Sequence, residues 1–479
     1  MLRLKNPVFV LALVAALAVG ASAQGREEED YAPAPLKPSP TPVAAPARPR
    51  LVVPTLMTMP SVPATKDAAA EPDDFRVLST STYSPTPAPT PYQHQGVYVT
   101  TLDGRVVMEQ AAGEAFNPAS AVKLATALKA LRDFGPEYRF STVVWTNGTF
   151  DKATGTLTGD LMVSGRDPSL HSEHAVDIAR ELNRLGIRTV TGDLYVSPGF
   201  TMNFSPTARR SGDGFYDTLD STRRSAAATR AWTSALLARK DQAGLASSPS
   251  VAVMGAVYVA PVPAGARVLL THRSSALTDL LKVLLCYSNN FMADRLGESV
   301  GGPAGLREFL IKEFAVPEWE VRLASASGLG VNRLSPRSMM KVYAGLRKEL
   351  AKHGLEPSDI LPVAGVDPGT LQKRYAASVA RGSIIGKTGT LGRTDGGASA
   401  LVGELRTRTG ETLLFVIFNR RGSVYRFRQD QDALVSSLQF ARGGPAPFTY
   451  VPHTLAMRLA DTEFDARTGA KGEYESISN

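Results

Sequence analysis

Residues 116–134 constrain the fold of this chain most, because they place a serine and a lysine where a loop becomes a helix. After Pro118, apolar residues recur at helical spacing until Gly135, which predicts one helix. Ser120 and Lys123 are three residues apart, so their side chains share one face of its first turn. A serine hydroxyl becomes a nucleophile when a base takes its proton, and a lysine is such a base once its pKa is lowered.

This spacing alone does not identify a catalytic pair. A serine that only caps the helix, followed by a solvated lysine, has the same pattern, and Ser338 and Lys341 repeat it. At that second place Pro336 marks an ordinary helix start, with Ser335 as its N-cap. The other motifs of the chain must therefore decide which serine is functional.

Composition excludes several function classes. The 479 residues can form two or three domains, and a hydrophobic content of 43% supports a large core. The net charge of +8 suits an acidic partner, but the basic residues are scattered and no nucleic-acid-binding motif is present. We therefore expect no nucleic acid partner. The single cysteine, Cys286, excludes an intramolecular disulfide and is expected to be a buried apolar residue.

The N-terminus has the pattern of a secretory signal peptide, predicted over residues 1–23. Arg3 and Lys5 precede an apolar run over 8–19, and small residues at 21–23 form a cleavage site. The run is shorter than the ~20 residues of a membrane span, so a cleaved signal is favoured over an uncleaved anchor. We expect an exported protein in a bacterial periplasm, without a stable membrane anchor.

The rest of the chain divides by composition and periodicity. Residues 24–92 are rich in proline, alanine, serine and threonine, which predicts a disordered linker. The first ordered element is expected to be a hairpin over 96–109. Residues 93–145 and 250–445 are predicted to form the main domain, and 446–479 a flexible C-terminal tail.

An inserted α/β domain is predicted over 146–249. Strands are expected over 140–146, 155–163 and 189–196, and a helix over 172–185. Residues 201–249 have little periodicity and are not assigned. His171 and His174 could attract a metal ion, but other ligands are not evident nearby. A solvated helix start is favoured there, and no metal is expected.

A second polar motif follows the insertion. Ser288 and Asn290 lie after an apolar helix predicted over 277–285 and before a second helix over 291–297. The polar side chains of such a cluster either hydrogen-bond to one another and to the backbone within a turn, or they point into a cleft. Strands over 251–259 and 268–271 are expected to precede it.

The third motif, Lys387-Thr388-Gly389, lies on a predicted strand. Residues 382–388 are close to a P-loop, but the two glycines are one residue too near and no helix pattern follows. Gly389 would leave room for another group to approach the backbone closely. Strands over 400–406 and 413–419 and a final helix over 427–441 are expected after this motif.

The three motifs occur in the order Ser-x-x-Lys, Ser-x-Asn and Lys-Thr-Gly, each in a suitable local setting. This set is typical of penicillin-binding proteins and class A β-lactamases. No Ser-x-Asn lies between Ser338 and Lys387, so Ser120 is the predicted nucleophile.

From about residue 96 to residue 442 the chain resembles the low-molecular-mass class C penicillin-binding proteins, the S13 family of D-alanyl-D-alanine carboxypeptidases and endopeptidases. The stretches that carry this resemblance are 116–120, 192–194, 361–367 and 386–391. The implied fold is α/β of the α+β type: a penicillin-binding or serine β-lactamase-like domain with an antiparallel sheet flanked by helices, carrying the small inserted domain. Two departures are visible. Ser325–Leu329 replaces the typical Asp-Gly-Ser-Gly-Leu, and the insertion is shorter than in the larger members.

The resemblance implies a serine peptidase mechanism without a metal or cofactor. Ser120 would attack the carbonyl between two D-alanines of a peptidoglycan stem peptide, Lys123 would take its proton, and Lys387 would lower the Lys123 pKa by like-charge repulsion. Ser288 would relay a proton to the leaving nitrogen. β-Lactams would acylate the same serine. The implied substrate-binding residues include Asn290 for the peptide, and Lys387 and Thr388 for the terminal carboxylate. Gly389 and Thr390 follow on the same strand, and the backbone N–H groups of Ser120 and Thr390 would form an oxyanion hole.

Other functions remain open at this point. A serine β-lactamase or esterase on the same fold needs a group that activates water, and none is evident. A non-catalytic cell-wall-binding protein is disfavoured by the three intact motifs, and a nucleotide-binding P-loop protein by the glycine spacing. The sequence does not decide between carboxypeptidase and endopeptidase activity.

Overall fold

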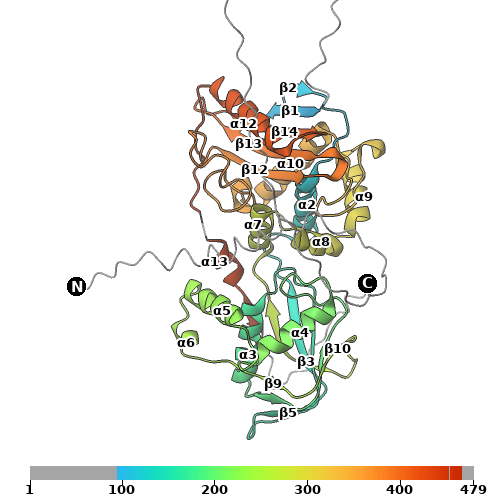
Figure 1. The fold of residues 1–479 in the computed structure, drawn as a ribbon, viewed down its shortest axis with the longest axis vertical. Coiled ribbons are helices and arrows are strands. Elements are labelled where there is room, and N and C mark those ends of the chain that lie inside the picture. Colours follow the sequence, from blue (N-terminus) through green and yellow to red (C-terminus); the bar gives the residue numbers. More distant parts are fainter. Residues whose placement is uncertain (1–93, 453, 466–479) are drawn as a thin grey trace, which may run out of the picture. The chain divides into compact units, whose positions relative to one another are not determined.

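Five antiparallel strands form the central sheet (Figure 1). The computed structural model describes residues 94–452 and 454–465, so the predicted signal peptide and linker lie outside the described residues. The strand order is β12 (Ile384–Leu391), β13 (Ala398–Arg406), β14 (Thr412–Arg420), β1 (Gln95–Thr101) and β2 (Val106–Gln110). The predicted hairpin and the strand position of the Lys-Thr-Gly motif are both confirmed.

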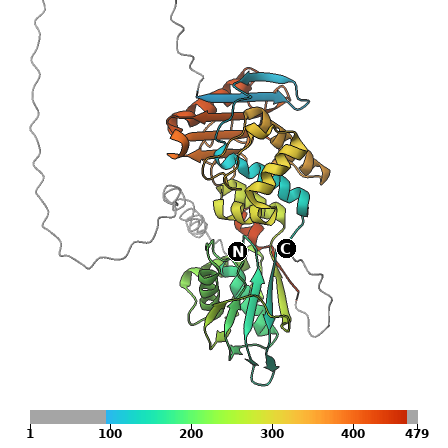
Figure 2. The ribbon, with the colours of Figure 1, turned by 90° about the vertical axis from the view of Figure 1, so that its right-hand side faces the viewer.

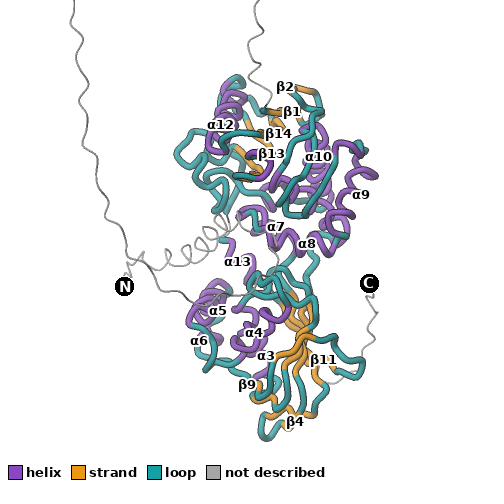
Figure 3. Tube along the Cα trace, turned by 45° about the vertical axis from the view of Figure 1, so that its right-hand side comes forward, coloured by secondary structure: helices purple, strands orange, loops and turns teal. Residues whose placement is uncertain are grey.

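Side chains alternate between the two faces of the sheet along β13 and β14, and both faces are buried. Helices lie on both sides of the sheet (Figure 3). Val402 and Val416 lie in the core shared with α2, α7 and α10, whereas Leu401 and Ile417 pack toward α12. The helices of this domain are α2 (Lys123–Phe134), α7 (Leu277–Tyr287), α8 (Asn290–Ser299), α9 (Gly302–Phe314), α10 (Pro336–Lys352), α11 (Pro357–Ile360) and α12 (Val424–Phe440). The predicted fold class, an antiparallel sheet flanked by helices, is confirmed.

Two further sheets combine strands of the predicted insertion with strands that flank it in the sequence (Figure 2). The larger has the order β10 (Val257–Val259), β8 (Leu194–Val196), β6 (Leu161–Gly165), β3 (Ser141–Thr146), β11 (Arg267–Arg273) and β15 (Glu463–Asp465). The smaller has the order β4 (Thr149–Asp151), β5 (Thr156–Thr158), β7 (Thr189–Val190) and β9 (Ala252–Val253). The helices α3 (Ser172–Arg184) and α4 (Ala208–Leu219) share the core of the larger sheet. The helix predicted over 172–185 is confirmed as α3.

Three segments predicted as single strands, 155–163, 189–196 and 251–259, are each divided between the two sheets. The physical reason is that two aspartate side chains, Asp160 and Asp193, bind backbone N–H groups at the dividing points. The Asp160 carboxylate accepts a hydrogen bond from the N–H of Asp193 at 2.8 Å, and the Asp193 carboxylate accepts one from the N–H of Ala256 at 2.7 Å. These side chains take backbone donors that would otherwise continue the ladder.

The unassigned segment 201–249 is mainly helical. After α4 it forms α5 (Ala226–Ala238) and the single turn α6 (Gln242–Leu245). The N-caps of α4 and α5 are Thr207 and Ser225, whose side chains accept hydrogen bonds from the first turns. The segment is rich in serine, alanine and arginine and has little apolar periodicity along the sequence, which is why its helices were not predicted.

The pairing of the strands that flank the predicted insertion bears on its limits. β3 and β11 pair with each other across the predicted limits of the insertion, so we propose that the inserted domain extends from about residue 141 to 273. The flexible tail predicted over 446–479 is wrong for its described part, because this part forms α13 (Leu455–Ala460) and the strand β15, which pairs with β11.

A fully buried ion pair joins α7 to the loop before β12. Lys282 Nζ donates to Asp367 Oδ2 and to the carbonyls of Ser358 and Leu361, each at 2.7 Å. The Tyr450 hydroxyl donates to the other Asp367 oxygen at 2.9 Å. Both charged side chains have zero solvent exposure. Removing one partner would leave the other as an uncompensated buried charge, which is strongly destabilising.

Lys282→Met is therefore expected to lower the free energy of unfolding by about 3–5 kcal/mol. Urea titration followed by circular dichroism measures this change. The control is Lys312→Met, which removes an exposed lysine paired with Glu308 and should leave stability essentially unchanged. Equal stability of the two variants would contradict a structural role for the buried pair.

Candidate active site

Ser120 lies in one 3₁₀ turn, η1 (Ala119–Val122), which leads directly into α2. The Asn117 side chain accepts from the N–H of Ala119 at 3.1 Å and so fixes the entry to this turn. Lys123 Nζ donates to Ser120 Oγ at 2.9 Å. The serine is 6% exposed and the lysine is fully buried. The structure therefore places the predicted nucleophile and base in direct contact.

Lys123 also connects this pair to two distant segments. Its Nζ donates to Asn290 Oδ1 at 2.6 Å and to the Ser327 carbonyl at 2.7 Å. Asn290 is the first residue of α8. The Ser-x-Asn motif thus reaches the Ser-x-x-Lys motif through its asparagine.

A sharp turn between α7 and α8 positions the Ser-x-Asn motif. Ser288 ends α7 with φ +56° and ψ 39°, a left-handed conformation that is uncommon for a residue other than glycine. Asn289 then caps α8 with its side chain. Lys387 Nζ, fully buried on β12, donates to Ser288 Oγ at 2.8 Å and to the Thr388 carbonyl at 2.6 Å. All three motifs therefore meet around this turn.

The remaining predicted site residues lie on the same strand. A Cβ at Gly389 would come within 2.7 Å of the Pro118 carbonyl oxygen. The close approach expected at this glycine is thus made by the chain's own segment before Ser120. Thr390 Oγ1 accepts a hydrogen bond from Arg428 at 2.9 Å, and Thr388 is largely buried.

Sequence reasoning missed the contribution of the turn at Ser325–Leu329. Besides the Ser327 carbonyl, its Ala326 carbonyl accepts from Thr126 of α2 at 2.7 Å. A Cβ at Gly328 would lie 2.0 Å from the Ala119 carbonyl oxygen, so the turn packs directly on η1. A residue two hundred positions away that contributes only a backbone carbonyl leaves no local trace in the sequence.

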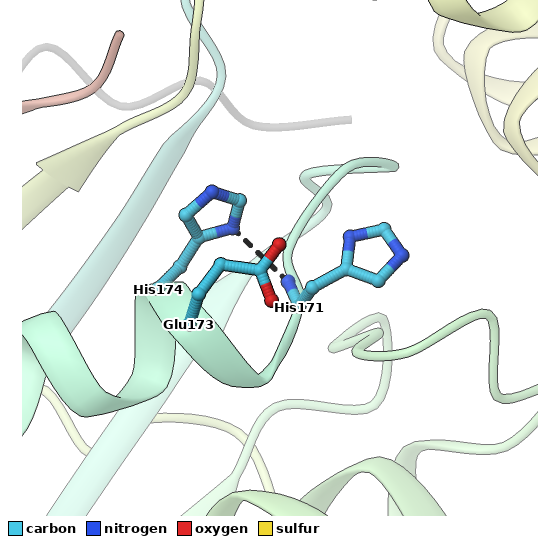
Figure 4. A group of neighbouring side chains, drawn as sticks. All are labelled: His171, Glu173 and His174. Atoms are coloured by element: carbon cyan, nitrogen blue, oxygen red, sulfur yellow. Dashed lines mark hydrogen bonds between the residues drawn. The ribbon is translucent and has the colours of Figure 1, made fainter. Parts of the chain in front are cut away.

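His171, Glu173 and His174 lie together at the start of α3, as Figure 4 shows, with candidate ligand atoms within 4.8 Å of one another. His174 Nδ1 accepts from the backbone N–H of His171 at 3.1 Å, and Nε2 lies 3.1 Å from the Leu459 carbonyl oxygen. Both ring nitrogens of His174 are therefore engaged. His174 is buried and Glu173 is a third potential ligand, so the expectations of a solvated helix start and of no further ligand nearby are both wrong. The contacts of His174 favour helix capping over metal binding.

Cys286 lies in the apolar core one turn after Lys282. Burial raises the pKa of its thiol to about 12. The thiolate, which is the reactive form of cysteine, is thereby suppressed. The prediction of a buried apolar cysteine is confirmed.

Comparison with known proteins agrees with this geometry. The family described as "D-Ala-D-Ala carboxypeptidase 3 (S13) family" matches residues 87–204 and 220–439. The D-alanyl-D-alanine carboxypeptidase of Actinomadura sp. (strain R39) is 28% identical to this chain, and the match covers 73% of this chain and 82% of that protein.

Two solved structures share the fold. One is a penicillin G-acylated predatory endopeptidase from Bdellovibrio bacteriovorus in complex with an immunity protein, with a TM-score of 0.63, 23% identity and coverage of 75% of this chain and 96% of that one. The other is penicillin-binding protein 4 from Haemophilus influenzae in complex with a β-lactam, with a TM-score of 0.54, 22% identity and coverage of 72% and 96%. The match to the family covers more than half of the 479 residues of this chain. This chain therefore belongs to the D-Ala-D-Ala carboxypeptidase 3 (S13) family.

Proposed function

We propose that this protein is a serine D-alanyl-D-alanine carboxypeptidase, endopeptidase or both, which cleaves peptidoglycan stem peptides through an acyl-enzyme on Ser120. The observation that carries this proposal is the 2.9 Å contact between Lys123 Nζ and Ser120 Oγ on two buried side chains. Membership of the S13 family and the names of its relatives support the substrate class.

The contacts of Lys123 suit a general base. A neutral amine has two N–H groups and one lone pair. The Asn290 amide oxygen and the Ser327 carbonyl can only accept, so they take the two N–H groups. The lone pair is then left for the Ser120 hydroxyl, which can turn its proton toward Nζ. Proton transfer to Lys123 accompanies attack of Ser120 on the carbonyl carbon.

Ser288 is suited to deliver a proton to the leaving amine. Because Lys387 Nζ donates to Ser288 Oγ, the hydroxyl proton of Ser288 is directed away from Lys387. The proton that Lys123 has gained reaches the leaving nitrogen through Ser288, and the C–N bond breaks. Water then hydrolyses the ester on Ser120.

The outer edge of β12 is suited to hold the substrate. Among the described strands β12 pairs only with β13, apart from one bridge between Val363 and Ile385. An extended peptide can add to such an edge through backbone hydrogen bonds. Lys387, Thr388 and Gly389 would then lie beside the terminal carboxylate, and the N–H groups of Ser120 and Thr390 would face the developing oxyanion.

Export to a periplasm is part of this proposal, because stem peptides lie outside the cytoplasm. The predicted cleavage site after Ala23 lies outside the described residues. None of the described helices combines the length and the apolar character that crossing a membrane requires.

Ser120→Ala is expected to abolish both labelling by a fluorescent penicillin and D-alanine release from a peptide ending in D-Ala-D-Ala, because the nucleophile is removed. Ser338→Ala is the matched control, since Ser338 belongs to the competing Ser-x-x-Lys pattern on α10 and should retain both activities. Labelling of the first variant would identify a different nucleophile.

Lys123→Ala is expected to slow acylation by benzylpenicillin by about 10²–10⁴-fold, the usual contribution of a general base. Stopped-flow measurement of acylation tests this, with circular dichroism as a check on folding. Lys129→Ala changes a lysine of the same helix that pairs with Asp133 and should acylate at the wild-type rate. A wild-type rate in the first variant argues against Lys123 as the base.

Digestion of purified sacculi, analysed by mass spectrometry, tests the reaction itself. Loss of terminal D-alanine indicates carboxypeptidase activity, and conversion of cross-linked dimers to monomers indicates endopeptidase activity. Unchanged sacculi together with rapid nitrocefin turnover would replace the proposal with a serine β-lactamase.

A further inference from the structure

A carboxylate on α8 reaches the Ser120–Lys123 pair through a single residue. Asp294 lies one helical turn after Asn290, so the two side chains share one face of α8. Asp294 Oδ1 accepts a hydrogen bond from the Ser327 N–H at 2.9 Å. The carbonyl of the same Ser327 accepts from Lys123 Nζ at 2.7 Å. The peptide groups on the two sides of Ser327 therefore link the carboxylate to the amine.

The turn that contains Ser327 is packed tightly around this link. Its Ala326 carbonyl is bound by Thr126 of α2, and its Gly328 lies against the η1 backbone. Ser325 Oγ closes the turn by donating to the Leu329 carbonyl at 3.0 Å. A shift of this turn would consequently move the Ser327 carbonyl relative to Lys123.

Asp294 also brings negative charge toward Lys123. Burial raises the pKa of Asp294, whereas its hydrogen bonds to Ser327 and the positive charge of Lys123 act in the opposite direction. By reciprocity, an ionised Asp294 favours the protonated form of the Lys123 amine. Arg295, the next residue of α8, also brings positive charge toward Asp294.

We propose that Asp294 is a positioning residue for the Ser120–Lys123 pair. It holds the turn at Ser325–Leu329 so that the Ser327 carbonyl orients the amine, and its negative charge sets how readily that amine gives up its proton. This inference rests on the proposed role of Lys123 as the base.

The test is the pH dependence of benzylpenicillin acylation in the full chain. Asp294→Asn keeps an oxygen for the Ser327 N–H but removes the charge, so the neutral amine forms at lower pH. The acid limb of the rate profile should move to lower pH by about 1 unit. Asp294→Ala removes the acceptor as well, and its rate at the plateau should fall by roughly tenfold or more, a typical effect of loosening a catalytic group.

Glu298→Gln is the matched control. It removes a carboxylate one turn further along α8, where Glu298 is exposed and pairs with Arg295, and it should leave both rate and profile unchanged. Circular dichroism confirms folding, and the near-isosteric asparagine variant keeps the test valid if the alanine variant unfolds. An asparagine profile that superimposes on the wild type overturns the inference. If wild-type protein is not acylated at all, the proposed function fails as well.

Discussion

Three lysine side chains, Lys123, Lys282 and Lys387, have no solvent exposure, and this burial organises the main domain. The N–H groups of a buried lysine, whether the amine is charged or neutral, need oxygen atoms to replace the water that they lose. Those oxygens come from segments far apart in the sequence. Hydroxyl, amide and carbonyl oxygens surround Lys123 and Lys387, and a carboxylate with two carbonyls surrounds Lys282. When the fold brings these acceptor oxygens to the buried lysines, it also brings together the residues of the candidate site.

The helix α7 connects two of these lysines. Lys282 anchors its middle to the loop before β12, and its last turn ends at Ser288, which binds Lys387 on β12 itself. The helix is thus joined at one point to the loop before β12 and at a second point to β12 itself. Such a rigid frame explains how Ser288 is kept in its unfavourable left-handed conformation, because the cost is borne by well-satisfied contacts on both sides.

The sequence predicted the parts of the site that carry local patterns. The serine and lysine of the first motif, the turn at Ser288 and the strand at Lys387 each have a clear helical or strand context, and each lies where it was expected. Contacts made by backbone atoms were not predictable, as the Ser327 carbonyl shows. The division of three strands between two sheets was hidden for a similar reason: Asp160 and Asp193 act through hydrogen bonds to neighbouring strands. Apolar periodicity carries no information about such partners.

The return of the chain to the larger sheet of the inserted domain has a practical consequence. After completing the main domain, the polypeptide places β15 along β11, with Phe464 opposite His272. In this way the last described strand shields a backbone edge that would otherwise offer unpaired N–H and C=O groups. A protein shortened just after α13 keeps every motif of the candidate site and the Tyr450 contact to Asp367, yet it exposes that edge to strands of other molecules. Recombinant versions should therefore retain residues up to 465, since self-association rather than loss of chemistry is the hazard of trimming them.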